Sequence, residues 1–388
     1  MTRRVCFLFN HEEVHQIAHT LPVARQLAVA APDISIDIAI SSASQERVVR
    51  EFLQGAPEAA RLNIVRLGLG QPLEFLTTAL SKIFPARRIA ILARNLDYFS
   101  QFDALVVPEF TSTLLKSRWN MTKPALICIP HGSGDRSVGF SDELNLFDLI
   151  LVAGDKTRDR MVARHPGLAD RISVCGYPKF DALDLSRKIR LFDNDRPTVL
   201  YNPHFDPRLS SWYRFGPQVL EYFAKQDRYN LIFAPHVMLF RKAIHGSLEH
   251  RDLRFRGHVP ERYRHLPHIR IDTGSDRSID MTYTLAGDIY LGDVSSQIYE
   301  WLVRLRPAIF LNSHDAAWQD DPNYAHWQLG EVIDDVADLG AALGRVEANP
   351  DAYRAAQEQA RAITFAQSDI PTSRRCADAI AGFLTSRA

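Results

Sequence analysis

Short runs of consecutive apolar residues alternate along the whole chain with stretches in which apolar residues recur every three or four positions. Such runs are typical of strands buried on both faces of a parallel sheet. They cover 4–9, 34–40, 62–67, 103–108, 125–130 and 148–153, then 197–202, 230–235, 268–272, 287–292 and 307–312. The segments between them, such as 21–31, 155–165 and 295–305, have the spacing of amphipathic helices. The alternation predicts an α/β fold with doubly wound, Rossmann-like parallel sheets.

A polar, charged segment at 183–197 interrupts this alternation before a new strand begins. With 388 residues, the chain is long enough for two domains. We expect a first Rossmann-like domain over 1–185 and a second over 186–365. A last helix is expected over 366–388, and the sequence does not decide whether it packs back on the first domain. Ligands of such sheets bind beyond the carboxyl ends of the strands.

The charge balance bears on which partners the chain recruits. The 46 basic residues match 46 acidic ones, so the net charge does not attract nucleic acid or an anionic membrane, although a local basic patch still could. The four cysteines form no CxxC pair, which favours reduced, packed thiols. The first apolar run is too short for a signal segment, and no run approaches the ~20 residues of a membrane span. We therefore expect a cytoplasmic protein, of undetermined oligomeric state.

The stretch HEEVH at 11–15 matches the H-E-x-x-H pattern of zinc proteases. That pattern belongs inside a long helix, whereas this stretch directly follows the first predicted strand and opens a loop. The glycine-containing spacing to a third ligand after His19 is also missing. We expect no metal site here, and interpret these histidines as cleft-lining residues or as surface residues.

The stretch 276–312 contains the most informative candidate site. Its pattern is helix, strand, turn, helix, strand, and the turn carries Asp293, Ser295 and Ser296 at the start of a helix. Unpaired backbone N–H groups and two hydroxyls at a helix start favour a phosphate. Glu300 follows one turn later, where its carboxylate could accept hydrogen bonds from a ribose. The alternative is that Asp293 and Ser295 only cap the helix.

Several motifs occur in an order that resembles one family over about 125–335. These motifs resemble successive signatures of the CDP-glycerol glycerophosphotransferases, which include teichoic-acid polymerases and primases. In chain order they are IPHGSG, CGYPKFDAL, VLYNPHFDP, FAPH, TLAGDIYLGDVSSQIYE and NYAHWQLGEVIDD. Within these motifs the landmarks are His131, Gly132, Gly176, Pro178, Asp181 and His236.

The resemblance implies a GT-B arrangement that transfers a polyol phosphate from a CDP-linked donor to an acceptor hydroxyl, without a metal or other cofactor. An imidazole suits proton removal near neutrality, so we assign His131, with Gly132 beside it, as the general base. His236 is assigned to stabilise the transferring phosphate or the leaving group. The nucleotide would be held by Ser295, Ser296 and Glu300 together with Gly132 and Asp293, and the acceptor would belong to a cell-surface polymer or glycolipid.

The sequence departs from the family pattern at its cations. An arginine is absent from NPHFDP, and Ala234 replaces the lysine before the proline and histidine of FAPH. Arg208, Arg277 and Arg241 are candidates to compensate. Two rivals therefore stay open: a UDP- or GDP-sugar glycosyltransferase or epimerase of the same fold, and a non-catalytic nucleotide-binding partner.

Two basic stretches complete the candidate chemistry. The segment 82–96 mixes cations with large apolar residues, and could lie on a membrane that presents a lipid-linked acceptor; a plain surface helix is the alternative. The segment 250–270 is rich in arginine and histidine, which fits either attraction of an anionic substrate or a solvated loop.

Overall fold

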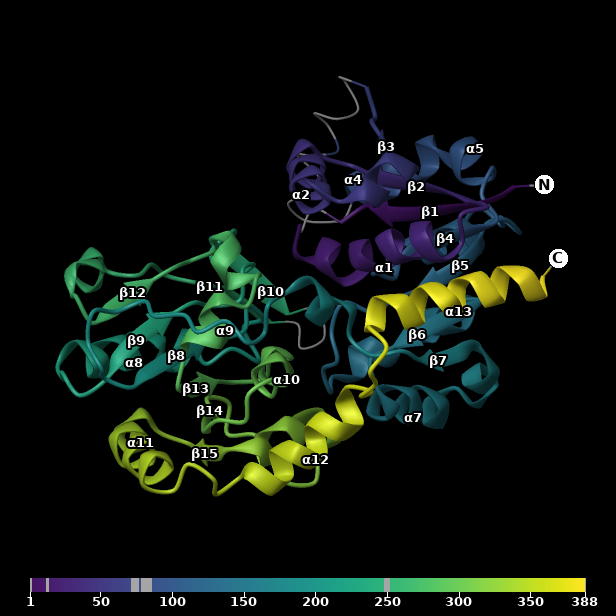
Figure 1. The fold of residues 1–388 in the computed structure, drawn as a ribbon. Coiled ribbons are helices and arrows are strands. Elements are labelled where there is room, and N and C mark those ends of the chain that lie inside the picture. The colour runs from purple at the N-terminus through teal and green to yellow at the C-terminus, as the bar shows by residue number, and fades with distance from the viewer. Residues whose placement is uncertain (1, 12–13, 71–76, 78–85, 248–251, 388) are drawn as a thin grey trace. The chain divides into compact units, whose positions relative to one another are not determined.

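The computed structural model describes residues 2–11, 14–70, 77, 86–247 and 252–387 (Figure 1). The chain forms two compact units. The first contains Met1–Ser133, Phe140–Asp184 and Ile363–Ala388, and the second contains Gly134–Gly139 and Leu185–Ala362. A short segment from the first half of the sequence therefore belongs to the second unit.

The first unit is built on a seven-stranded sheet with the order β3-β2-β1-β4-β5-β6-β7, in which every neighbouring pair is parallel. Its strands are β1 (Arg3–Phe9), β2 (Ile34–Ile40), β3 (Leu62–Arg66), β4 (Ala104–Val107), β5 (Ala125–Cys128), β6 (Leu149–Val152) and β7 (Ile172–Val174). Its helices are α1 (Ile17–Ala30), α2 (Ala43–Leu53), α4 (Ala86–Arg94), α5 (Leu96–Phe99), α6 (Leu114–Ser117), α7 (Asp155–Arg164) and α13 (Thr372–Ser386).

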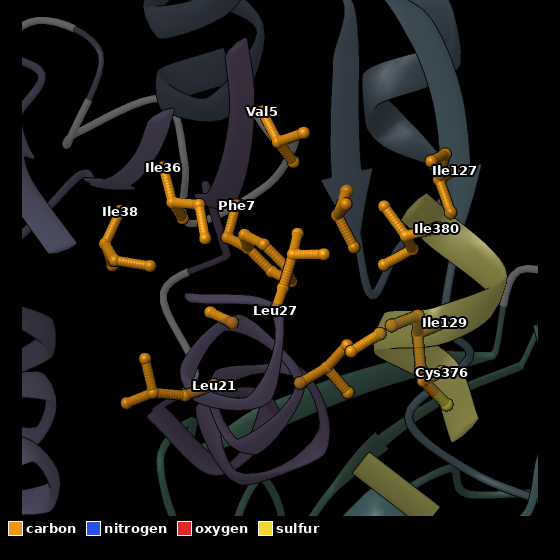
Figure 2. Close-up of a cluster of buried hydrophobic side chains, with 14 of the residues drawn as sticks. Val5, Phe7, Leu21, Leu27, Ile36, Ile38, Ile127, Ile129, Cys376 and Ile380 are labelled. Carbon is orange, nitrogen blue, oxygen red and sulfur yellow. The ribbon is translucent and has the colours of Figure 1, made fainter. Parts of the chain in front are cut away.

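Alternate residues of β1 enter two different cores, because side chains along a strand alternate between the faces of a sheet. Val5 and Phe7 pack with α1 and α13 on one face, where Cys376 and Ile380 join them (Figure 2). Cys6 and Leu8 pack on the other face with residues of α4, α5, α6 and α7. The C-terminal helix α13 is thus part of the first unit's core.

The second unit has a six-stranded parallel sheet with the order β12-β9-β8-β13-β14-β15. Its strands are β8 (Thr198–Asn202), β9 (Asn230–Phe233), β12 (Ile269–Ile271), β13 (Ile289–Gly292), β14 (Ala308–Leu311) and β15 (Glu331–Ile333). Its helices are α8 (Trp212–Ala224), α9 (Thr282–Ala286), α10 (Gln297–Trp301) and α11 (Leu339–Ala348), and α12 (Arg354–Thr364) runs across the boundary at residue 362. A separate antiparallel hairpin pairs β10 (Ile244–Ser247) with β11 (Asp252–Phe255).

These sheets confirm the predicted α/β fold with doubly wound parallel sheets, and each apolar run predicted as a strand contains one. The pattern of apolar runs does not predict β7, β15 or the hairpin, because these strands are three or four residues long and partly exposed. The helix expected over 295–305 is shorter than predicted, since α10 ends at Trp301. There the guanidinium of Arg306 stacks on the Trp301 ring at 3.6 Å, and its Nη1 donates to the Thr284 carbonyl at 2.9 Å.

Candidate functional site

The winding of the second sheet reverses between β8 and β13, and the loops after these two strands therefore flank a topological switch point. Doubly wound sheets bind their ligands at such points. The loop after β8 is tied to the turn after β13 by Asp293. Its Oδ1 accepts the backbone N–H of His204 at 2.9 Å, and its Oδ2 accepts the N–H and the hydroxyl of Ser211 at 2.6 and 2.8 Å.

Asp293 is buried, with 1% of its surface exposed. Burial raises its pKa to about 7, against the opposing effect of the hydrogen bonds from Ser211 and His204. We predicted that Asp293 contacts the nucleotide directly. In the structure its carboxylate oxygens are engaged by the loop after β8, so its visible role is to shape that loop.

Ser295 and Ser296 occupy the turn between Asp293 and α10. Ser295 is buried, and its Oγ accepts the N–H of Gln297 at 3.3 Å, as expected of the capping alternative. Ser296 is exposed. A Cβ added at Gly134 would lie 3.1 Å from the Cβ of Ser296, so a glycine lets the segment 134–139 approach this turn closely. Glu300 is buried inside α10.

Two imidazoles stand at the carboxyl ends of neighbouring strands in the same unit. His204 follows β8 and His236 follows β9, and their ring centroids are 5.4 Å apart. Phe205 packs on both rings, with centroids 4.5 Å from His204 and 4.8 Å from His236. His236 is a predicted site residue, whereas His204, which lies within the NPHFDP motif, is not.

Backbone hydrogen bonds orient both rings. Nδ1 of His204 accepts the N–H of Asp206 at 3.0 Å, and Nδ1 of His236 accepts the N–H of Met238 at 3.3 Å. In each neutral ring the proton is therefore assigned to Nε2, which becomes a hydrogen-bond donor. Burial lowers the pKa of His204 well below its usual range, and the charges of His236 and Arg136 lower it further. His204 is thus neutral at pH 7.

The segment 134–139 is fastened to the second unit by a buried carboxylate that the sequence analysis missed. Oδ2 of Asp135 accepts the hydroxyl of Tyr299 at 2.6 Å and lies 3.0 Å from Nδ1 of His326. Both side chains of the Asp135–His326 pair are almost fully buried. Nε2 of His326 lies 3.3 Å from the backbone oxygen of Asp293, which links this network to the switch point. It places Arg136 within electrostatic reach of His204.

His131 belongs to the first unit, where it follows β5 and its side chain is exposed. Its Nδ1 lies 2.7 Å from the carbonyl oxygen of Pro108, which assigns the proton to Nδ1 and leaves Nε2 as an acceptor. Desolvation of the ring by the surrounding chain lowers the pKa of His131. The Pro108 carbonyl and the Glu109 charge oppose this shift. Its ring lies 6.3 Å from that of His19, a buried residue of α1. Gly132 follows it in the same loop.

The predicted residues that remain include Arg208, Arg277 and the motif residue Asp181. Arg208 approaches Asp252 of β11 at 3.9 Å, and Arg277 is exposed on the segment after the edge strand β12. Asp181 of the CGYPKFDAL motif accepts the N–H and hydroxyl of Ser373 at 2.6 and 2.7 Å, so it caps α13. Arg208 and Asp181 therefore have an ion-pair or hydrogen-bond partner within the protein.

The motif at 11–15 and the segment 82–96 are only partly described. Residues 12–13 and 78–85 lie outside the described residues. Of the three bulky apolar residues in α4, Ile91 and Leu92 are buried and Ile89 is half-buried, which favours the surface-helix interpretation over a membrane-facing one. Within the described ranges, no three histidine, cysteine or acidic side chains gather as metal ligands would, and no helix is long and apolar enough to cross a membrane.

Solved structures share this architecture at low sequence identity. A UDP-GlcNAc 2-epimerase from Neisseria meningitidis bound to UDP-GlcNAc superposes with a TM-score of 0.55 at 12% identity, covering 100% of both chains. The wall teichoic acid polymerase TagF gives 0.59 at 10% identity, covering 100% of this chain and 90% of its own. The glycotransferase of kitacinnamycin gives 0.58 at 15% identity, covering 99% of this chain and 100% of its own. No protein-family profile and no curated protein matches the sequence. The similarities confirm the two-domain GT-B fold.

Proposed function

We propose that this protein is a transferase that moves a polyol phosphate, such as glycerol phosphate, from a CDP-linked donor to an acceptor hydroxyl. The observation that carries the proposal is the pair of oriented imidazoles, His204 and His236, beside the turn that holds Ser295 and Ser296. Their Nε2–H groups are suited to donate to phosphate oxygens. The motif order shared with CDP-glycerol glycerophosphotransferases supports the same donor class.

In the proposed reaction the acceptor oxygen forms a bond to the donor's β-phosphorus. The bond from that phosphorus to the bridging oxygen breaks, and CMP leaves with the electron pair. His131 accepts the proton of the acceptor hydroxyl at Nε2, which its lowered pKa keeps unprotonated at pH 7. His236 and His204 donate hydrogen bonds to the phosphate, and Arg136 supplies positive charge near them. Ser296 and Glu300 are proposed to contact the nucleotide.

A second candidate is a UDP- or GDP-sugar glycosyltransferase or epimerase. Structural similarity to an epimerase bound to UDP-GlcNAc and to a glycotransferase supports this second candidate. The similarity to TagF supports the CDP-linked candidate to the same degree. A phosphate-binding turn does not select the base, so the two candidates share the histidine pair. A non-catalytic nucleotide binder is the third, favoured by the missing arginine and lysine.

A substrate panel separates these candidates. The protein is incubated with CDP-glycerol, CDP-ribitol, UDP-GlcNAc and GDP-mannose, each with and without a glycerol-phosphate acceptor, and the released CMP, UDP or GDP is quantified. The proposal expects CMP release that depends on the acceptor and falls at least about 100-fold in His236→Ala. The exposed His265→Ala serves as a matched control in the same unit. Release of UDP or GDP instead, or epimerised sugar, would select the second candidate, and no turnover would select the third.

A further inference from the structure

The hairpin β10–β11 carries an exposed apolar face. Among the described residues six large hydrophobic side chains are exposed, and three of them are on these eight hairpin residues: Ile244 at 53%, Leu253 at 71% and Phe255 at 70%. Ile244 pairs directly with Phe255, and Leu253 pairs with Gly246. Directly paired residues share a face of the hairpin. Because Gly246 has no side chain, its position on β10 leaves Leu253 of β11 uncovered.

The opposite face of the hairpin holds it to the second unit. His245 points inward, is 6% exposed, and its Nε2 lies 2.8 Å from the Leu239 carbonyl oxygen. After β11, the guanidinium of Arg256 donates to the Lys242 carbonyl at 2.8 Å, and the Trp212 indole donates to the Arg256 carbonyl at 2.6 Å. The apolar face is therefore presented on an anchored element, rather than on a frayed chain end.

The segment that carries this face is rich in cations. The described residues of 241–258 include the basic Arg241, Lys242, Arg254 and Arg256 against one acidic residue, Asp252, although the whole chain has no net charge. Arg241 and Lys242, just before β10, are exposed, whereas Arg254 pairs with His245 and belongs to the opposite face of the hairpin. Exposed aliphatic and aromatic side chains with a basic rim are the composition of surfaces that rest at the headgroup boundary of an anionic bilayer. The apolar side chains enter the boundary while the cations meet the lipid phosphates.

We propose that the β10–β11 face docks this protein on an anionic lipid surface. Its inner side contacts the candidate site, since the rings of His245 and Phe205 are 6.2 Å apart and Phe205 packs on His204 and His236. Docking would hold the histidine pair near the headgroups, where an amphiphilic substrate is presented. The inference does not depend on the identity of the donor, so vesicle binding and CMP release succeed or fail separately.

The test is co-sedimentation of the full chain with vesicles of phosphatidylglycerol mixed with phosphatidylcholine, and with vesicles of phosphatidylcholine alone. We expect binding to the anionic vesicles that weakens at least about tenfold in the double variant Leu253→Ser/Phe255→Ser. The charge variant Arg241→Gln/Lys242→Gln is expected to weaken it by about tenfold, since each cation near an anionic surface contributes to binding. Val29→Ser/Ile370→Ser removes two other exposed hydrophobic side chains, which are 54% and 52% exposed, and should change nothing.

Each outcome decides the proposal. It is overturned if the wild-type protein binds anionic vesicles no better than phosphatidylcholine. It is also overturned if only the charge variant weakens binding, because the surface is then a general polyanion site. If the apolar double variant turns a dimer into a monomer in light scattering and leaves vesicle binding unchanged, the face is an interface between two copies. Thermal melting of every variant verifies that these exposed substitutions leave the fold intact.

Discussion

Replacing Asp293 with asparagine tests whether a buried acid organises the switch point of the second sheet. Asparagine keeps the shape and one carbonyl oxygen, but it turns an amide NH₂ toward the donors that now reach the carboxylate from Ser211 and His204. A buried donor left without an acceptor costs about 1–3 kcal/mol. At pH 5, where the raised pKa leaves the native acid protonated, we expect Asp293→Asn to be less stable than the wild type by about that amount.

The pH dependence makes this prediction sharper. The folded protein keeps the Asp293 proton up to about pH 7, whereas the unfolded chain loses it near the ordinary aspartate pKa of 3.8. Unfolding therefore releases a proton in this window, and the wild type loses stability as the pH rises through it. Three pKa units correspond to about 4 kcal/mol, of which about 2 kcal/mol falls between pH 5 and pH 7. Asp293→Asn has no such group, so the stability gap between the two proteins should shrink by about 2 kcal/mol.

Urea unfolding followed by tryptophan fluorescence measures this gap. Four of the five tryptophans lie in the second unit, so the signal reports mainly on the unit that contains Asp293. The exposed Asp320→Asn is the control for removing a carboxylate from the same unit, and it should follow the wild type at every pH. A gap that stays constant or widens from pH 5 to pH 7 would refute the reasoning, because it would mean that the loop donors keep Asp293 ionised.

Three further predictions follow from other parts of the structure. His131→Ala should lower turnover at least about 100-fold while the affinity for CDP changes less than about twofold, and the acid limb of the wild-type pH–rate profile should lie below 6.5 because the pKa of His131 is lowered. Gly154→Ala places a Cβ 2.4 Å from the backbone oxygen of Thr364, so the melting temperature should drop by several degrees. Asp135→Ala leaves the buried His326 and Tyr299 without their acceptor and should cost about 3–5 kcal/mol in urea unfolding.

Matched substitutions distinguish these effects from general damage. Gly382→Ala adds a methyl group within α13 where nothing lies within 4 Å, and should leave the melting temperature unchanged or raise it. Asp142→Ala removes a carboxylate whose side chain is 89% exposed, and its cost should stay below about 0.5 kcal/mol. Equal losses in Gly154→Ala and Gly382→Ala, or in Asp135→Ala and Asp142→Ala, would contradict the packing argument. For His131, a loss of CDP affinity that matches the loss of turnover would contradict its assignment as a base.

The sheets were predictable because their strands are apolar on both sides, as Val5 and Cys6 illustrate by entering opposite cores. The short edge strand β15 was not predicted, since three residues, of which two are half-buried, carry little periodic signal. Parts of the candidate site also depend on contacts that no local pattern contains. Asp135 and His326 meet across 191 positions of sequence. In the sequence that contact is marked only by an aspartate that follows the glycine-rich stretch HGSG.

The turn at Asp293 shows a second limit of sequence patterns. An aspartate and two serines before a helix fit both a phosphate site and a cap, and the choice depends on where their atoms point. The structure directs the Asp293 carboxylate to the loop after β8, and the Ser295 hydroxyl to its own helix. The proposed donor site therefore depends chiefly on the pair His204 and His236. His204 was identified from its ring contact with His236 in the structure, and not from the sequence.

Calorimetric titration of CDP, UDP and GDP into the full chain tests the central claim most directly, because it needs no acceptor. The account predicts saturable binding of one nucleotide per chain, with CDP preferred, and at least about tenfold weaker binding in His236→Ala than in His265→Ala. Equal binding of CDP by these two variants, or no saturable heat with any nucleoside diphosphate, would contradict it.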